Sequence, residues 1–329
     1  DLDLGAANVH ACLGILRKTP TIADFIQKRA ASLEQILIDT SRNNLKLISG
    51  ADFMPGMANP AYWMKLKIMR HIKAIPADIV ILDLGAGVHF NTLDFFGIAD
   101  RGVVLTAPEP GAVMNAYGFI KGALFRKLQG IFRRHPEISH IIDEESKKTE
   151  AESRLTLEQF ADEVKRIDPE LHPLIHEVEQ TFNPALVVNR VPEGQSHILV
   201  KNLLSLSRDK LGISIDHIGN LPDIRDISDY LLNVPGFLDA RVGKPYRSAV
   251  MGIIDDLNMP REITPNTMKK TEYSDEDVER ILKVMERLDD SVFTGTNREA
   301  WKLRMYFKPS EVIDFLSSRG VSQELLRLG

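Results

Sequence analysis

Cysteine is nearly absent from this chain, because Cys12 is the one cysteine among 329 residues. A disulfide needs two thiols, and a cysteine-ligated zinc or iron–sulfur site needs several, so both are excluded within these residues. This usage is typical of a reducing compartment. We therefore expect a cytoplasmic protein, with a peripheral position at the inner face of the cell membrane as the alternative.

Long hydrophobic runs and a strong net charge are also missing. No apolar run reaches the roughly 18 residues that a membrane span requires. The formal net charge is only −5, so any contact with nucleic acid or anionic lipid must depend on a local patch. We expect no specific nucleic acid partner. The nine histidines are scattered and form neither a metal-ligand cluster nor a Ser-His-Asp spacing.

The most informative stretch that is present runs from residue 77 to residue 106. Its two short aliphatic runs, Ile79–Leu82 and Val103–Leu105, are typical of strands that are buried on both faces. Between them lie Asp83, two glycines and a segment with helical spacing. The pattern predicts an α/β fold in which a polar loop follows the first strand. Ligands bind at such carboxyl ends of parallel strands.

Three interpretations of this loop remain open on its own residues. VILDLGAG resembles the first motif of S-adenosylmethionine-dependent methyltransferases, and it also resembles the Walker B and switch II segment of P-loop ATPases. The third interpretation is that the glycines serve turn geometry alone. The methyltransferase pattern requires a third glycine where His89 and Phe90 stand. It also requires an acid at the end of the next strand, which here ends in Thr106.

The opening segment, DLDLGAANVHACLG, places two acids at alternate positions. In extended backbone Asp1 and Asp3 lie on one side of the chain. The alternative is a helix-capping turn, in which Asp accepts hydrogen bonds from free N–H groups. This segment resembles the second acidic motif of the MinD/ParA ATPases, especially of the FlhG branch that governs flagellar number and placement. The matching positions are Asp1, Asp3, Gly5, Asn8 and Gly14.

Further motifs follow in the order that this family has, namely DLGAG, TAPEP, VVNRV and LPD. A methyltransferase does not need the last three, so it becomes a distant alternative. The resemblance covers about residues 1–257 apart from an insertion. It implies a P-loop NTPase of the deviant Walker A type, in which a mostly parallel sheet is flanked by helices.

The glycine-rich phosphate loop of the family has no counterpart in the 329 residues, since no GKGGVGKS-like segment occurs. In the family that loop precedes the acidic pair. The resemblance therefore implies a domain, residues 1–260, that lacks its first βα unit. A chain that begins at Asp1 is then expected to be inactive as an ATPase.

The resemblance implies roles for residues that follow the strands. Asp3 and Asp1 are the expected catalytic acids, Asp83 is the expected Mg²⁺ residue, and Gly87 belongs to the loop that senses the γ-phosphate of ATP. Phosphoryl transfer of this kind depends on positioning and charge neutralisation.

Five further residues are expected to contact the nucleotide. Glu109 would reach the nucleotide of the facing subunit, and its alternative is a turn residue at a helix start. Asn189, with Arg190, would contact the adenine edge, which an amide can both donate to and accept from. Pro222 and Asp223 would close over the base.

The implied activity is that of an ATP-dependent, dimerising switch that positions a cellular structure. The expected partners are a second copy of the chain across bound ATP and proteins of the flagellar or another positioning machinery. Asn115 departs from the family, which has an acid at that point of the dimer face. The rival hypothesis is an inactive MinD-like scaffold that only binds partners.

Several segments depart from a compact ATPase. We predict a helix over 19–41, a basic helix over 62–74 with a solvated charged face, and a helical insertion over about 121–182. The apolar stripe of the insertion near 125–132 is predicted to pack in a helical hairpin or to lie on anionic lipid. Residues 261–274 are a predicted linker, and residues 275–329 are a predicted helical extension that binds membrane or a partner.

Overall fold

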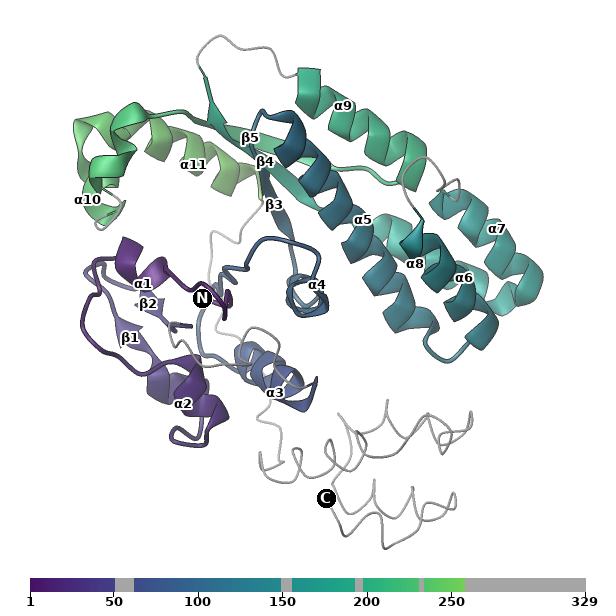
Figure 1. Cartoon of the computed structure of the whole chain (residues 1–329), viewed down its shortest axis with the longest axis horizontal. Helices are drawn as coiled ribbons and strands as arrows, with labels where there is room; N and C mark the ends of the chain where they lie inside the picture. Colours follow the sequence, from purple (N-terminus) through teal and green to yellow (C-terminus); the bar gives the residue numbers. More distant parts are fainter. Residues whose placement is uncertain (51–61, 149–155, 193–197, 231–233, 258–329) are drawn as a thin grey trace, which may run out of the picture.

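The computed structural model describes residues 1–50, 62–148, 156–192, 198–230 and 234–257. These residues form an α/β structure with two parts, which we call the amino-terminal region (1–98) and the sheet region (101–257) (Figure 1). The predicted linker and the predicted carboxyl-terminal extension lie outside the described residues.

The sheet region is built on three parallel strands in the described part of the chain, in the order β3-β4-β5. These are β3 (Val103–Thr106), β4 (Ala185–Val191) and β5 (Asp216–Pro222). The predicted strands at 103–105 and 186–188 are confirmed. The middle of β4 is aliphatic and at most 3% exposed, as expected for a strand with neighbours on both sides.

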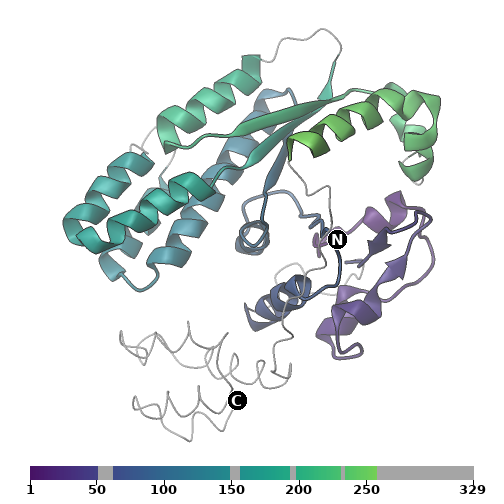
Figure 2. The same ribbon diagram turned by 180° about the vertical axis from the view of Figure 1, so that it is seen from behind.

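Helices cover both faces of this sheet, as the two opposite views show (Figures 1 and 2). Leu186 and Val188 share a core with α5 and α9, whereas Val187 packs against α11 on the other face. Side chains alternate between the faces because a strand has a period of two. The three helices are α5 (Pro110–Phe132), α9 (Ile198–Leu206) and α11 (Lys244–Asp256).

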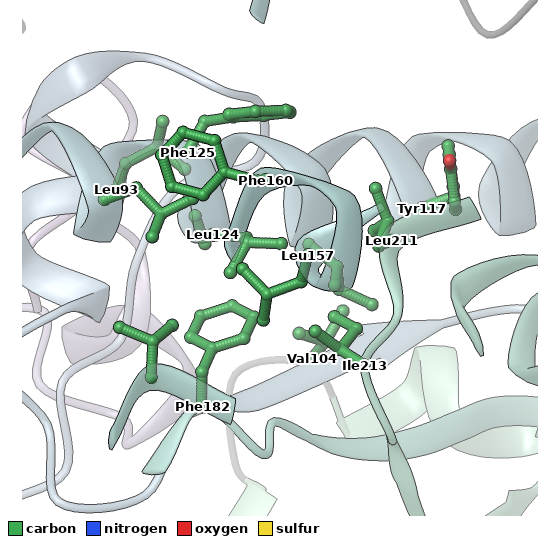
Figure 3. Packing of buried hydrophobic residues seen from close by; sticks show 14 of the residues in the cluster. Leu93, Val104, Tyr117, Leu124, Phe125, Leu157, Phe160, Phe182, Leu211 and Ile213 are labelled. Carbon is green, nitrogen blue, oxygen red and sulfur yellow. The ribbon is translucent and has the colours of Figure 1, made fainter. Parts of the chain in front are cut away.

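The large core of the sheet region continues beyond the sheet into a layer of helices. Figure 3 shows Phe125, Phe160 and Phe182 packed in this core with leucine side chains between them. The apolar stripe of α5 is therefore buried, and Phe132 is 0% exposed. The lipid-facing alternative is wrong for this stripe, and the packed hairpin is confirmed. The added helices are α6 (Pro136–Lys147), α7 (Leu157–Ile167) and α8 (His172–Thr181).

The amino-terminal region has a separate core around Phe25, Leu33 and Ile68. The prediction of one helix over 19–41 is wrong, because the helix stops at Ile26 and Lys28 takes a left-handed φ of 62°. A right-handed helix cannot continue through that conformation. The elements here are α1 (Val9–Cys12), α2 (Ile22–Ile26), β1 (Ile38–Asp39), β2 (Lys46–Leu47), α3 (Tyr62–Lys73) and α4 (Phe90–Phe96).

The prediction of a buried strand at Ile79–Leu82 is also wrong in this structure. The run belongs to no strand, and Ile81 is 82% exposed. A parallel strand is held by hydrogen bonds to its neighbours, and nothing in the run itself supplies them. Within the described residues, β3 lies at the edge of its sheet and has a strand partner on one side only.

Helix α3 also differs from its prediction in one respect. The helix is confirmed, but Lys65 and Lys67 are only 4% and 5% exposed, so its charged face is not uniformly solvated. The Lys67 ammonium lies 4.2 Å from the centre of the Phe25 ring, a geometry in which the ring attracts the cation. In the described part of the chain, every helix is too short or too polar to cross a lipid bilayer.

Candidate functional site

The first group of predicted site residues lies where the opening segment meets the central loop. The Leu2 N–H donates to the Asp83 carbonyl at 2.7 Å, so the acidic pair runs alongside the end of the 79–83 stretch. On its other side, the Asp1 amino nitrogen donates to the Ile48 carbonyl at 2.9 Å. The structure thus brings Asp1, Asp3 and Asp83 together. We call these residues and Gly85 the acidic group.

The carboxylate of Asp1 accepts hydrogen bonds from backbone N–H groups. One oxygen accepts from the N–H groups of Asn8 and Val9, at 3.0 and 3.1 Å, and the other accepts from the Asp3 N–H at 3.2 Å. These are the contacts of a capping residue at the start of α1. In this structure Asp1 therefore holds the segment that carries Asp3.

Asp3 lies directly against the central loop. A Cβ placed on Gly85 would come within 2.8 Å of the Asp3 carboxyl carbon and of one carboxylate oxygen. Only glycine leaves room for that approach without a shift. The Asp3 carboxylate therefore lies beside the backbone of the loop that Asp83 begins.

The chemistry of the acidic group suits Mg²⁺ bound together with phosphates. Asp83 is exposed, and within the described residues its carboxylate has no hydrogen bond or ion pair. Mg²⁺ keeps several waters and uses one or two protein carboxylates plus substrate phosphates. The described part of the chain contains no cluster of three or more His, Cys, Asp or Glu that would hold a metal without such help.

The loop from Asp83 leads through Gly87 to α4. Gly87 has a φ of +99°, which residues with a side chain rarely adopt. The following His89 is extended, and α4 begins at Phe90. The left-handed turn at Gly87 thus redirects the chain from the acidic group into α4.

The second group of predicted site residues lies at the carboxyl ends of β3 and β4. Glu109, at the start of α5, forms an ion pair with Arg190 at 3.2 Å. Arg190 takes a left-handed φ of 57°, and its N–H donates to the Asn189 side chain at 2.9 Å. This turn lifts the guanidinium out of β4 toward the start of α5. Both charged side chains are more than half exposed, at 64% and 58%.

The end of β5 joins the same group. Pro222 is in register with Val191, and the Asp223 N–H donates to the Val191 carbonyl at 3.0 Å. Together Glu109, Asn189, Arg190, Pro222 and Asp223 form what we call the strand-end group. Parallel strands bring such residues together because their carboxyl ends share one edge of the sheet.

The structure does not connect the two groups. Within the described residues, no hydrogen bond or ion pair links the acidic group to the strand-end group. Each group is internally ordered, and the two are contributed by different regions of the molecule. Gly87 lies between Asp83 and α4. Among the described residues it has no hydrogen bond to Glu109 or Arg190.

One cluster of charges beside the loop was not predicted from the sequence. Asp94 on α4 accepts hydrogen bonds from Lys65 on α3 and from Arg126 on α5, the latter at 2.5 and 3.0 Å. Burial alone would raise the pKa of Asp94, but the bonds from Arg126 and Lys65 outweigh burial and hold it below its usual range. The only sequence signal was one acid inside the apolar run LDFF.

The parallel sheet and its flanking helices define an α/β protein, and this architecture is compatible with a fold of the P-loop NTPase kind. No family model matches the chain. It is 27% identical over 129 residues to antiactivator FleN of Pseudomonas aeruginosa, and 27% identical over 132 residues to flagellum site-determining protein YlxH of Helicobacter pylori.

Each of these matches covers 37% of this chain, and they span 43% of FleN and 41% of YlxH. The matched stretch is thus less than half the length of either relative. These two similarities support the relationship to the FlhG branch of the MinD/ParA-type proteins that the motifs predicted.

Proposed function

We propose that this protein is an ATP-dependent molecular switch of the MinD/ParA type that controls the position or number of a cellular structure such as the flagellum. The observation that carries the proposal is the acidic group. Asp3 lies against Gly85, and the Leu2 N–H beside it donates to the Asp83 carbonyl. The similarity to an antiactivator, FleN, and to a flagellum site-determining protein, YlxH, supports the biological setting.

In this proposal the residues have separate tasks. Asp3 orients the water that attacks the γ-phosphate, and Asp1 holds the Asp3 segment through the capping bonds of α1. Asp83 carries the water shell of Mg²⁺, which supplies charge neutralisation on the phosphates when it is bound. Gly87 gives the loop its freedom to respond to the γ-phosphate.

The strand-end group is the proposed nucleotide-base site. Asn189 offers an amide to the adenine edge, while Pro222 and Asp223 stand beside it after β5. Glu109 and Arg190 neutralise one another in the free protein. Glu109 must leave this exposed pair to reach the nucleotide of a facing subunit, and the cost is small because exposed pairs are weak.

The active state would be a dimer that forms around two ATP molecules and separates after hydrolysis. We propose that flagellar or other positioning proteins recognise this dimer, and that its place in the cell is the cytoplasm or the inner face of the membrane. The rival function is a scaffold of the same fold that binds partners without nucleotide.

Titration calorimetry with the full-length natural protein, ATP and Mg²⁺ separates these two functions. We expect saturable binding, a dimer by light scattering, and slow phosphate release. Asp3→Ala should bind ATP but release phosphate at least 10²-fold more slowly, so the dimer should persist. Asp83→Ala should weaken the Mg²⁺ dependence instead.

The matched control for these variants is Asp143→Ala, which removes an exposed acid from α6, away from both groups. It should leave binding and phosphate release unchanged. A full-length protein that binds no nucleotide in calorimetry would exclude the switch and favour the scaffold.

A further inference from the structure

Helix α4 is the element that joins the two regions of the molecule. Its two fully buried residues belong to different cores. Leu93 lies in the core of the sheet region, and Phe95 lies in the core of the amino-terminal region. The helix has only seven residues and starts directly after the loop from Asp83 to His89. Its position therefore sets where that loop ends.

Asp94 lies between Leu93 and Phe95 in the sequence and accepts hydrogen bonds from both regions of the molecule. Its carboxylate accepts from Lys65 on α3 of the amino-terminal region and, through two nitrogens, from Arg126 on α5 of the sheet region. The Asp94 side chain is 15% exposed and that of Lys65 only 5%. Charged hydrogen bonds that are shielded from water in this way are stronger and more directional than surface pairs.

Arg126 holds α4 at a second point. Its guanidinium carbon lies 4.8 Å from the centre of the Phe90 ring, and Phe90 is the first residue of α4. The contact is favourable because the face of an aromatic ring attracts a cation. One arginine thus touches the start of the helix and its central acid, which fixes both the position and the rotation of α4.

We propose that Asp94 is a positioning residue that couples the Asp83–His89 loop to α3 and α5. The coupling follows from the geometry. A displacement of the loop moves α4, and α4 cannot move without carrying or breaking its bonds to Lys65 and Arg126. A change at the loop is thereby transmitted to both regions. The coupling deepens the proposed function, because it rests on a loop that responds to nucleotide.

Hydrogen–deuterium exchange of the full-length protein without nucleotide tests the clamp itself. Asp94→Asn keeps the shape of the side chain and removes its charge. We expect amide exchange at least tenfold faster across residues 84–96. Asp94→Glu, which keeps the charge, should recover most of the protection. Unchanged exchange at 84–96 in Asp94→Asn would overturn the proposal.

The matched control is Glu145→Gln, which removes another buried carboxylate that is paired with a lysine, Lys148, and that has no described hydrogen bond to α4. It should speed exchange in α6 and leave residues 84–96 as they are. If both variants speed exchange at 84–96 equally, the effect is general destabilisation, and Asp94 has no positioning role. If Asp94→Asn does not fold, Arg126→Lys replaces it, since it loses the two-nitrogen contact and keeps the charge.

A second series with ATP and Mg²⁺ tests the transmission. In the unaltered protein, nucleotide should slow exchange in the loop, in α3 and in α5. In Asp94→Asn it should slow exchange in the loop only. Slowing in all three segments of Asp94→Asn would overturn the coupling. If the unaltered protein binds no nucleotide, the proposed function fails, while the series without nucleotide still decides the clamp.

Discussion

The two apolar runs Ile79–Leu82 and Leu186–Val188 are similar in composition and different in structure. The second forms the middle of β4, between β3 and β5, and is at most 3% exposed. The first belongs to no strand, and Ile79, Val80 and Ile81 are 45%, 40% and 82% exposed. The difference shows that an aliphatic run becomes a buried strand only where neighbouring strands and helices pack against it.

The difference matters energetically because burial, rather than composition, stabilises a strand. Each buried methylene contributes about 0.8 kcal/mol, and an exposed one contributes almost nothing. A substitution that shortens a side chain should therefore lower the free energy of unfolding more in the buried run at 186–188 than in the exposed run at 79–82.

Truncation of matched aliphatic residues gives the clearest test. Leu186→Ala and Ile81→Ala each remove three carbons, but Leu186 is 0% exposed and Ile81 is 82% exposed. We expect Leu186→Ala to lower the free energy of unfolding by about 3 kcal/mol and Ile81→Ala by less than about 0.5 kcal/mol. Urea unfolding measures both. Equal losses would mean that Ile81 is buried in solution and that the two runs do not differ.

A half-buried histidine, His71, gives the amino-terminal region a pH dependence of its own. Burial, then the charges of Arg70 and Lys67, lowers the pKa of His71 from 6.5 to about 4. The unfolded chain therefore binds the proton first, so stability is complete above pH 6.5 and falls as pH decreases toward 4. With solvent access to the half-buried ring discounted, the loss is on the order of 1–2 kcal/mol.

His71→Phe should remove this loss, because it keeps a ring against Phe25 and has no proton to bind. Thermal unfolding across pH 4 to 8 measures the slope. Between pH 7 and 8 the two proteins should show the same slope. A slope below pH 6.5 that persists in His71→Phe would assign the pH dependence to other groups.

Two glycines should respond in opposite directions to the same change. Gly85→Ala would force the Asp3 carboxylate away, since the new Cβ would lie 2.8 Å from it, and we expect a loss of about 1 kcal/mol. Gly118 in α5 has no atom within 4 Å of its Cβ position, so Gly118→Ala should stabilise by about 0.5–1 kcal/mol. Thermal unfolding in one buffer compares them. Stabilisation by Gly85→Ala would show that Asp3 does not lie against Gly85.

The smallest effect is expected where a surface arginine ties the two regions together. Arg42 donates to the Pro235 carbonyl at 2.7 Å and pairs with Asp239 on α10 (Val234–Asp239). Both charged side chains are exposed, so Arg42→Ala should cost about 0.5 kcal/mol or less. Urea unfolding, followed with one probe in each of the two regions, measures this loss. A larger loss, or separate transitions for the two regions, would show that this tie holds them together.

The sequence predicted the sheet region well for a physical reason. The aliphatic run of β4 and the apolar stripe of α5 are the residues that the fold buries. The local sequence pattern and the tertiary packing therefore agree in these two elements. The residues of the strand-end group were predicted from the family resemblance, and the structure brings them together because parallel strands end at one edge of the sheet. Its residue types were found, but their roles in nucleotide binding remain predictions.

The amino-terminal region was predicted less well because its structure depends on contacts between distant segments. The stop of α2 at Lys28 is a left-handed turn in a lysine, which no residue preference indicates. The burial of Lys65 depends on Asp94, 29 positions away. The proximity of Asp3 and Gly85 likewise joins segments that only the fold brings together, so the family resemblance, rather than local pattern, suggested that they act together.

The open side of β3 has a consequence for the behaviour of the protein in concentrated solution. In the described structure the outer backbone groups of this strand have no strand beside them, and Leu105 is 59% exposed. The unpaired edge of a strand is a template on which another polypeptide in extended conformation can add. Self-association that grows with protein concentration, with a rising β content, would therefore involve an edge strand of this sheet, β3 or β5.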